Sequence, residues 1–417
     1  MRASPTVADA PAASWDWLPA VRTWLLVALV VGLALSISVS QIALAALAAW
    51  LLLARWAGRL PALQWPLLAP IAAFAAWSVV TALASERPLD ALYTCKSLLN
   101  LGALFVIANA LPDAATARRF ATWLVLAMAA ASVLAVVQVA VCPGPEATAY
   151  ASTLAGKFLR KCTRARGFYS IYMTLAGVLT LTLIAALPRL ARRPGEAWWL
   201  APVWIVGAAA LALTYVRGAW IGFAAGAVAA VAGLGRRGLV VAVALVVLVP
   251  ALLLGLPGVG ARLRTIGSTA DDTTRDRLAM LEAGRRLAVE HPVMGIGPGQ
   301  VKHVYGRVAP AEAMRLSTSH LHNTPLQMLV ERGLLGLATW LWIFVAFVVR
   351  GLAHWRRLPA AATADRALVL GSLAAVVAFL VGGLFEYNFG DTEVLLVALA
   401  LMALPFGLAR DGAAARP

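Results

Sequence analysis

Long apolar stretches recur along the whole chain of 417 residues. A helix that crosses about 30 Å of hydrocarbon needs about 20 apolar residues. About twelve stretches meet or approach that length; they lie at 23–39, 41–57, 66–84, 89–111, 119–141, 167–187, 198–216, 218–234, 238–257, 323–349, 366–386 and 391–409. The pattern predicts an all-α polytopic membrane protein with about 12 transmembrane helices. The first pair is the least certain, because a single tilted helix could replace two short helices joined near Ser36–Ser40.

The composition excludes a soluble enzyme and a disordered chain. Apolar residues make up 62% of the chain and charged residues 13%, whereas soluble domains are about half apolar and a quarter charged. The formal net charge is +16, which in a soluble protein would suggest nucleic acid. In a membrane protein the surplus has two other uses, orientation in the bilayer and binding of anionic lipids, and we expect no nucleic-acid partner.

Arginines in the short connections predict the orientation. They lie at alternate ends of successive spans, as the positive-inside rule requires: Arg55, Arg59, Arg118, Arg119, Arg189, Arg192, Arg193, Arg236, Arg237, Arg350, Arg356, Arg357 and Arg410. Both termini are then cytoplasmic, and the long connections 142–166 and 258–322 are external, which means periplasmic in a Gram-negative cell. We therefore expect residues 1–417 to form a single transmembrane domain that carries one large periplasmic loop.

The cysteines are consistent with this orientation. Cys142 and Cys162 bracket the first external loop, whereas Cys95 is alone in a span. An oxidising compartment would allow a disulfide between the two loop cysteines, and two unpaired thiols are the alternative.

The large loop carries no recognisable metal motif. His291, His303, His320 and His322 lie in it without cysteine and without zinc-type spacing, so we expect no metal site. The Gly-rich run 295–299 lacks dinucleotide-binding spacing and is read as a tight turn.

Within this loop we expect a helix that begins near Thr273, where Asp276 completes an arrangement similar to a capping box. One stripe of this helix would be apolar: Met280, Leu281, Gly284, Leu287 and Ala288 follow Arg277 along it. Arg277 then lies at the buried edge of an amphipathic helix. A solvated arginine is the alternative, and the sequence leaves open whether Arg275 or Arg277 faces a ligand.

His322 precedes the clearest helix start in the chain. Thr324 before Pro325 suits an N-cap followed by the first turn. The unpaired N–H groups at such an end attract anions and disfavour a protonated imidazole, so His322 fits a neutral general base beside an anionic substrate. A histidine that only hydrogen-bonds the loop backbone is the alternative. His320 and Asn323 flank His322 and are secondary candidates.

Two further arginines lie at the external ends of spans, Arg166 at 163–168 and Arg217 in the short turn 214–220. Guanidinium groups bind phosphate oxygens in pairs, so Arg166, Arg217 and Arg277 would suit a pyrophosphate, although boundary arginines often only snorkel. Further ionisable groups at the membrane edge are Lys96, and Asp391 together with Glu386. For each of them the alternatives are a functional role and a side chain that only snorkels to the interface.

These motifs resemble those of bacterial O-antigen ligases, which belong to a superfamily with O-antigen polymerases and O-oligosaccharyltransferases. His322–Asn323 and Gly333–Leu334–Leu335–Gly336, separated by nine residues, match the HN-x9-GxxG pattern of the ligases. The Arg-Gly-Ala-Trp turn at Arg217 and Arg277, 15 residues before Pro292, also agree. The likeness covers roughly residues 160–400; one departure is Val216, where relatives often have Ser.

The resemblance implies a metal-independent glycosyltransferase with a GT-C-like membrane fold and no cofactor. Such an enzyme moves O-antigen polysaccharide from undecaprenyl pyrophosphate to a sugar of lipid A–core, at the periplasmic face of the bacterial inner membrane. His322 would be the base and Arg166, Arg217 and Arg277 would bind the pyrophosphate, because an activated diphosphate needs only a base and cations. A single displacement would invert the anomeric centre.

Three other functions fit parts of the pattern. An O-antigen polymerase uses the same donor with a lipid-linked acceptor, and a protein-glycosylating relative usually carries an additional C-terminal region. A transporter or flippase of lipid-linked glycans would also have a dozen spans with internal charges, but here the ionisable residues gather at one face.

Overall fold

The fold is all-helical in the computed structural model, which describes residues 15–142, 161–236 and 272–414, with isolated positions at 159, 238–240, 243–244, 247 and 260. No strand occurs in these ranges. Nine of the described helices are long and apolar enough to span a membrane, and two shorter apolar helices occupy further expected positions. Most of the expected span 238–257 lies outside the described residues. The structure thus confirms a polytopic all-α membrane protein.

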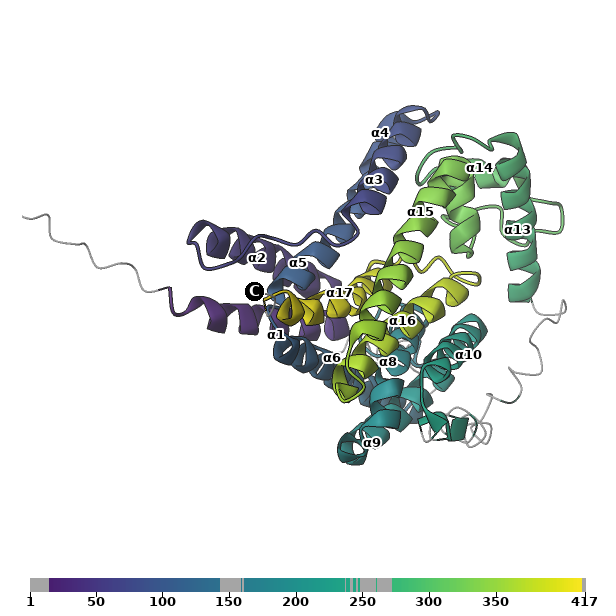
Figure 1. The fold of residues 1–417 in the computed structure, drawn as a ribbon. Coiled ribbons are helices and arrows are strands. Elements are labelled where there is room, and N and C mark those ends of the chain that lie inside the picture. Colours follow the sequence, from purple (N-terminus) through teal and green to yellow (C-terminus); the bar gives the residue numbers. More distant parts are fainter. Residues whose placement is uncertain are drawn as a thin grey trace, which may run out of the picture.

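The N-terminal part corresponds to five of the expected spans, and its helices are labelled in Figure 1. It contains α1 (Leu18–Leu35), α2 (Ile37–Trp56), α3 (Leu68–Leu83), α4 (Pro88–Thr94), η1 (Cys95–Leu101), α5 (Gly102–Ala110) and α6 (Ala114–Ala140). Two separate helices, α1 and α2, meet at Ser36, so the hairpin prediction for the first pair is correct. The expected span over 89–111 is present as Pro88–Ala110, and its middle, η1, is a 3-10 segment.

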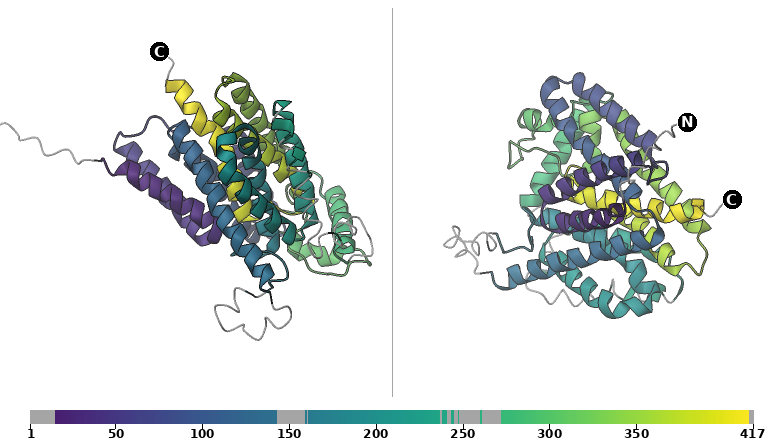
Figure 2. Two further views of the ribbon diagram at one scale, coloured as in Figure 1. Left: turned by 90° about the horizontal axis from the view of Figure 1, so that it is seen from below. Right: turned by 90° about the vertical axis from the view of Figure 1, so that its left-hand side faces the viewer.

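The C-terminal part contains the helices that frame the candidate site. They are α8 (Tyr172–Arg192), α9 (Pro194–Leu213), α10 (Arg217–Ala232), α13 (Asp272–Glu290), α14 (Val301–Val308), α15 (Thr324–Arg357), α16 (Thr363–Gly382) and α17 (Thr392–Ala414). At one end of the bundle α13 and α14 pack beside the first turns of α15, and the C-terminus lies at the other end (Figures 1 and 2).

The centre of the bundle is formed by α8, α16 and α17, which are the most buried of the long helices. Small residues allow α8 and α16 to approach closely, because a side chain on Gly371 would lie 2.2 Å from the carbonyl oxygen of Ala185. Gly222 of α10 likewise faces the backbone of α16 at Ala378. Lipid tails provide little hydrophobic drive for association between helices, so close backbone contact of this kind is what holds such a bundle together.

The helix of the large loop begins at Asp272, one residue before the expected start. Met280, Ala283 and Leu287 on one of its faces join Tyr305 and Leu321 in a small separate core. The expected stripe is wrong at Leu281, which is 38% exposed. Apolar residues at the edge of a stripe stay accessible when the facing element covers only its centre.

The start of α15 differs from the prediction by one residue, and the helix is broken at Gly333. Its N-cap is Asn323, whose side chain accepts a hydrogen bond from the N–H of Leu326, so the expected cap at Thr324 is wrong by one residue. A short helix leads into the span, because Gly333 breaks the helix at φ 66° and ψ −170°. A side chain at Gly333 would also collide with the backbone of Val293.

The cysteines of the first external connection are joined. Cys142, which follows α6, forms a disulfide with Cys162, while Cys95 is free. The bridge closes a loop across 20 positions and ends four residues before Arg166. It therefore fastens the segment that carries Arg166 to the end of α6.

Removal of this bridge in C142S/C162S should lower the free energy of unfolding by about 3 kcal/mol, because the unlinked loop gains conformational freedom. Thermal unfolding in detergent, followed by tryptophan fluorescence, measures the effect, and a reductant should reproduce it in the wild type. C95S is the matched control and should unfold at the wild-type temperature. An unchanged melting temperature of C142S/C162S would contradict the expectation.

Candidate functional site

Two of the sequence-predicted residues meet at a third side chain. Glu386, in the connection between α16 and α17, contacts Nδ1 of His322 through Oε1. Its Oε2 accepts a hydrogen bond from Nη2 of Arg277 at 2.9 Å. The side chains of His322, Arg277 and Glu386 are 17%, 26% and 16% exposed. One half-buried carboxylate thus holds the candidate base and a candidate cation together.

The backbone before α15 fixes the position of His322. Its φ is +48°, a left-handed conformation that few side chains adopt, and the next residue, Asn323, caps the helix. On the other side, the N–H of Leu321 donates to Oε1 of Gln327 at 2.8 Å. Both neighbours of His322 are therefore held by the first turns of α15.

His320 packs against His322, with their ring centroids 4.2 Å apart. Its Nδ1 is buried without a hydrogen-bond partner. Burial, reinforced by the nearby His322, lowers the pKa of His320 to about 4. His320 is therefore neutral at physiological pH.

The turn of Arg217 adjoins the same group. Arg217 is the first residue of α10, and a side chain on the following Gly218 would lie 2.4 Å from Cβ of Phe385. Phe385 directly precedes Glu386. A cavity of about 20 Å³ is lined by Val216, Ala219 and Glu386, so the two segments share a wall.

Arg166 is connected to this turn through the backbone. The N–H of Ala165 donates to the carbonyl of Leu213 at the end of α9, three residues before Val216. Nη1 of Arg166 donates to the carbonyl of Tyr169 at 3.0 Å. The N–H groups of Arg166 and Gly167 both donate to the amide oxygen of Gln138, which is fully buried in α6.

The secondary candidates make other contacts. Arg275 is 50% exposed and pairs with Asp272 of its own helix, so of the two arginines it is Arg277 that faces His322. Asp391 accepts hydrogen bonds from the hydroxyl of Thr174 and from the N–H of Val394, as the cap of α17. Asn323 is also a cap, and Lys96 lies exposed over the ring of Tyr93.

The site contains one group of residues of the metal-ligating type. Ligand atoms of His320, His322 and Glu386 all lie within 4.8 Å of one another, a spacing that could hold a cation. The sequence expectation of no metal did not consider Glu386 as a partner of these histidines. Arg277 already occupies Oε2 of this carboxylate, and its positive charge opposes a second cation there.

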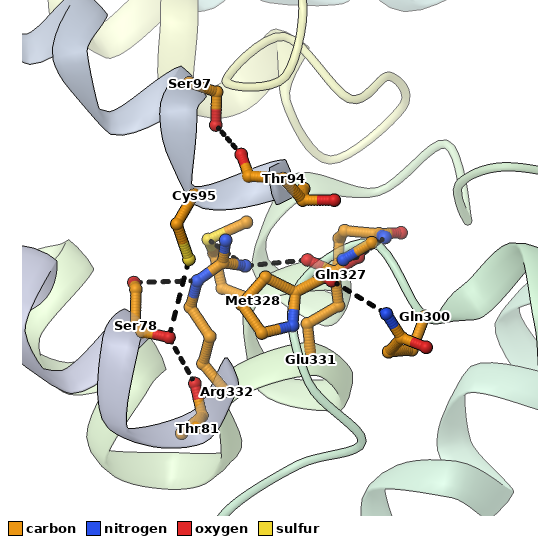
Figure 3. Close-up of polar contacts among 12 residues, drawn as sticks. Ser78, Thr81, Thr94, Cys95, Ser97, Gln300, Gln327, Met328, Glu331 and Arg332 are labelled. Carbon is orange, nitrogen blue, oxygen red and sulfur yellow. Dashed lines mark hydrogen bonds and ion pairs between the residues drawn. The ribbon is translucent and has the colours of Figure 1, made fainter. Parts of the chain in front are cut away.

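Beneath the site lies a buried ion pair in α15 (Figure 3). Nη1 of Arg332 donates to Oε2 of Glu331 at 2.7 Å, and both side chains are almost inaccessible. Nε of Arg332 donates to the hydroxyl of Ser78 in α3. Oε1 of Glu331 accepts from Gln327 at 2.7 Å and from the N–H of Gly299 at 2.8 Å. This cluster ties α3 and the Gly-rich turn to the first part of α15.

The Gly-rich turn fits against that part of α15. Gly295, Gly297 and Gly299 have positive φ, so the reading as a tight turn is correct. A side chain at Gly295 would lie 2.4 Å from the backbone carbon of Glu331. The turn donates from Ile296 and Gly297 to the carbonyls of Val330 and Glu331, which compensates for the helix break at Gly333.

Residues 202–341 match the model of the O-antigen ligase family. The match covers about a third of the chain and shows that this segment is similar to the family. The segment contains Arg217, Arg277 and His322, whereas Arg166 and Glu386 lie outside it. No curated protein matches the chain.

The match agrees with the resemblance that the motifs indicate. Members of this family are glycosyltransferase-like enzymes, ligases and polymerases, that use lipid-linked polysaccharides in a membrane. The segment 202–341 contains both the HN-x9-GxxG motif and the Arg-Gly turn on which the resemblance depends.

Sequence reasoning missed the partners of these residues. Glu386 is 64 positions from His322 and 109 from Arg277, and no spacing rule connects them. Glu331 and Arg332 lie next to each other within an apolar helix, which was the available signal, because adjacent opposite charges at membrane depth are expensive unless paired.

Replacement of Glu331 by Gln should leave the buried guanidinium of Arg332 without its counter-charge. Loss of one partner of a buried pair typically costs about 3–5 kcal/mol. We expect a clear fall in the melting temperature of E331Q in detergent, measured by tryptophan fluorescence. E282Q is the matched control. Glu282 pairs only with the exposed arginines Arg285 and Arg286 of its own helix, and such surface pairs contribute little, so this variant should keep the wild-type melting temperature. Equal melting of both variants would contradict the assigned role.

Stability should also depend on pH through His320. Its pKa is about 4 in the folded protein, against 6.5 as the ordinary value, so below pH 6.5 the unfolded chain takes up a proton that the folded protein does not. The melting temperature should therefore fall as the pH decreases from 6.5 to about 4. This fall should be smaller in H320Q and unchanged in H291Q, in which an exposed histidine is replaced; an identical pH profile of H320Q and wild type would refute the effect.

Proposed function

We propose that this protein is an O-antigen ligase. It would transfer O-antigen polysaccharide from undecaprenyl pyrophosphate to a sugar hydroxyl of lipid A–core, in the synthesis of lipopolysaccharide. The observation that carries the proposal is the shared carboxylate of Glu386, which joins a histidine to an arginine in a chain whose residues 202–341 match the O-antigen ligase family. A base and an anion-binding cation are the two groups that this transfer needs.

His322 acts as the general base in this proposal. With Nδ1 turned to the Glu386 carboxylate, the ring donates through Nδ1 and keeps Nε2 as the proton acceptor. Nε2 takes the proton of the acceptor hydroxyl while its oxygen forms a bond to the anomeric carbon. The bond from that carbon to the pyrophosphate oxygen breaks, and the anomeric centre is inverted. Glu386 stabilises the imidazolium that results, as the carboxylate of a catalytic triad does.

The arginines bind the leaving pyrophosphate. Arg277 contacts Glu386 through one Nη2 hydrogen bond, so it is held in place by the carboxylate that also holds the base. Arg217, at the first turn of α10, adds its charge to the positive end of the helix dipole, which attracts anions. Arg166 supplies a third cation from the adjoining segment. Developing charge on the pyrophosphate is thereby neutralised without a metal or a cofactor.

The proposal includes a direction in the bilayer. The positive-inside distribution of arginines supports cytoplasmic termini and a site that faces the periplasm. Undecaprenyl pyrophosphate and lipid A–core are both membrane lipids, so a site at the ends of the helices meets their reacting groups at the interface. The disulfide between Cys142 and Cys162 supports the same assignment, because disulfides persist in the oxidising periplasm.

Replacement of His322 by Asn should remove ligation while the protein still inserts. Reconstituted protein with undecaprenyl-pyrophosphate-linked glycan and lipid A–core provides the assay, and we expect a fall in rate of about 10²–10⁴-fold for H322N. E386Q keeps the shape of the side chain but removes the charge that orients His322, and its rate should fall by about tenfold or more. H291Q is the control and should ligate at the wild-type rate.

The same reaction mixtures separate the alternatives. Chain elongation in the absence of lipid A–core would identify a polymerase, and movement of glycan across the membrane without bond formation would identify a transporter. Loss of ligation in a chelator with recovery on addition of Zn²⁺ would make His320, His322 and Glu386 metal ligands. Ligation at the wild-type rate by folded H322N would contradict the assignment of His322 as the general base.

A further inference from the structure

A second polar pocket lies among the ends of four helices. Its volume is about 400 Å³, and four arginines line it together with Glu196 and Trp123. The arginines come from the start of α6 (Arg118 and Arg119), the end of α8 (Arg189) and the residue before α9 (Arg193). Residues at the start of α16 complete the wall.

This pocket is far from His322. It contains Ala364, at the start of α16, whereas Glu386 follows the end of the same helix. A helix of 20 residues is about 30 Å long, so the two sites lie at opposite ends of the bundle. The pocket therefore lies at the end of the bundle where α16 begins, whereas α13 and α14 lie at the other end (Figure 2).

The positive charges of the pocket exceed the negative ones. Glu196 is shared, since Arg189 binds its Oε2 at 2.8 Å and Arg193 binds its Oε1 at 2.9 Å. Arg118 pairs with Asp365 at 2.6 Å. Arg119 is exposed, and its hydrogen bond within the described part of the chain is a 3.4 Å contact with Thr116; Asp113 acts on it only through longer-range attraction.

Arg189 is the unusual member of the group. Its side chain is only 8% exposed, yet its Nη1 has no hydrogen-bond partner among the described residues. A buried guanidinium normally has its donors satisfied, because an unpaired one costs free energy. This cluster has an unsatisfied buried donor and only one carboxylate for two arginines. A further anionic group would satisfy the remaining donor.

The surroundings are those of a membrane interface. Trp123 lines the pocket half-buried, and Trp198, two residues after Glu196, is 80% exposed. Tryptophan gathers at the level of lipid headgroups, and basic pockets between spans hold anionic headgroups.

We propose that this pocket binds a phosphate group, with Arg119, Arg189 and Arg193 as its ligands. The group comes from the headgroup of an anionic phospholipid in the leaflet at that end of the protein, or from free phosphate, since both present the same oxygens. Guanidinium donors match such oxygens in pairs. The inference does not depend on the proposed glycosyl transfer, because the two sites share no residue.

Binding of phosphatidylglycerol to detergent-purified full-length protein, counted by native mass spectrometry, tests the proposal. The wild type should retain one more phosphatidylglycerol than R119Q/R193Q, with an affinity about tenfold higher. Both proteins should retain the same amount of phosphatidylcholine. In this variant Arg189 still pairs with Glu196, which preserves the internal ion pair. R356Q/R357Q removes two exposed arginines from the end of α15 at the same end of the bundle, and it should bind like the wild type.

A second variant separates binding from folding. Ala115 is exposed and lines the pocket in the first turn of α6, where a glutamate favours the helix. A115E should therefore keep the wild-type melting temperature and lose the phosphatidylglycerol.

Inorganic phosphate is the third probe. If it binds the wild type but not R119Q/R193Q, and phosphatidylglycerol does not, the site is still a phosphate site, with the free ion as its source. Equal retention of phosphatidylglycerol by wild type, R119Q/R193Q and A115E, with no binding of inorganic phosphate, would overturn the proposal.

Discussion

The carboxylate of Glu386 contacts side chains from two segments that are distant in the sequence. It contacts His322, before α15, and Arg277, in α13, while Glu386 itself connects α16 to α17. A charge at the edge of a membrane is costly unless it is paired, so this carboxylate draws the segments together instead of remaining alone. The histidine and the arginine are thereby brought within reach of one substrate. Their roles in the proposed transfer depend on these two contacts with Glu386, which position both side chains.

The buried pair of Glu331 and Arg332 supports that arrangement from below. Gln327 connects the two levels, because its amide oxygen holds Leu321 beside His322 and its amide nitrogen donates to Glu331. The turn at 295–299 closes over the same carboxylate through the N–H of Gly299. Rigid elements thus position His322, although it lies in a connection, and a precise site needs support of this kind. The basic pocket at the far end of the bundle is independent of this network.

Much of the fold could be predicted from the sequence, because hydrophobic length is a local property. Eleven of the expected spans correspond to described helices, the hairpin at Ser36 is present, and Cys142 is joined to Cys162. The errors are local as well. The cap lies at Asn323 and not at Thr324, since both residue types suit that position, and the 3-10 segment in the fourth span leaves no mark in hydropathy. Leu281 is exposed because only the neighbouring elements determine how much of a stripe is covered.

The sequence by itself determined the class of protein, the approximate positions of most spans and the residue types of a base and of phosphate-binding cations. Residues 202–341, which match the O-antigen ligase family, contain His322 and Arg277. Only the tertiary structure decided that Arg277 and not Arg275 faces His322, that Glu386 joins them, and that four arginines at the opposite end share one pocket. The physical reason is that hydropathy and helix caps act over a few residues. Ion pairs between distant segments depend instead on how the helices pack, which no short sequence window contains.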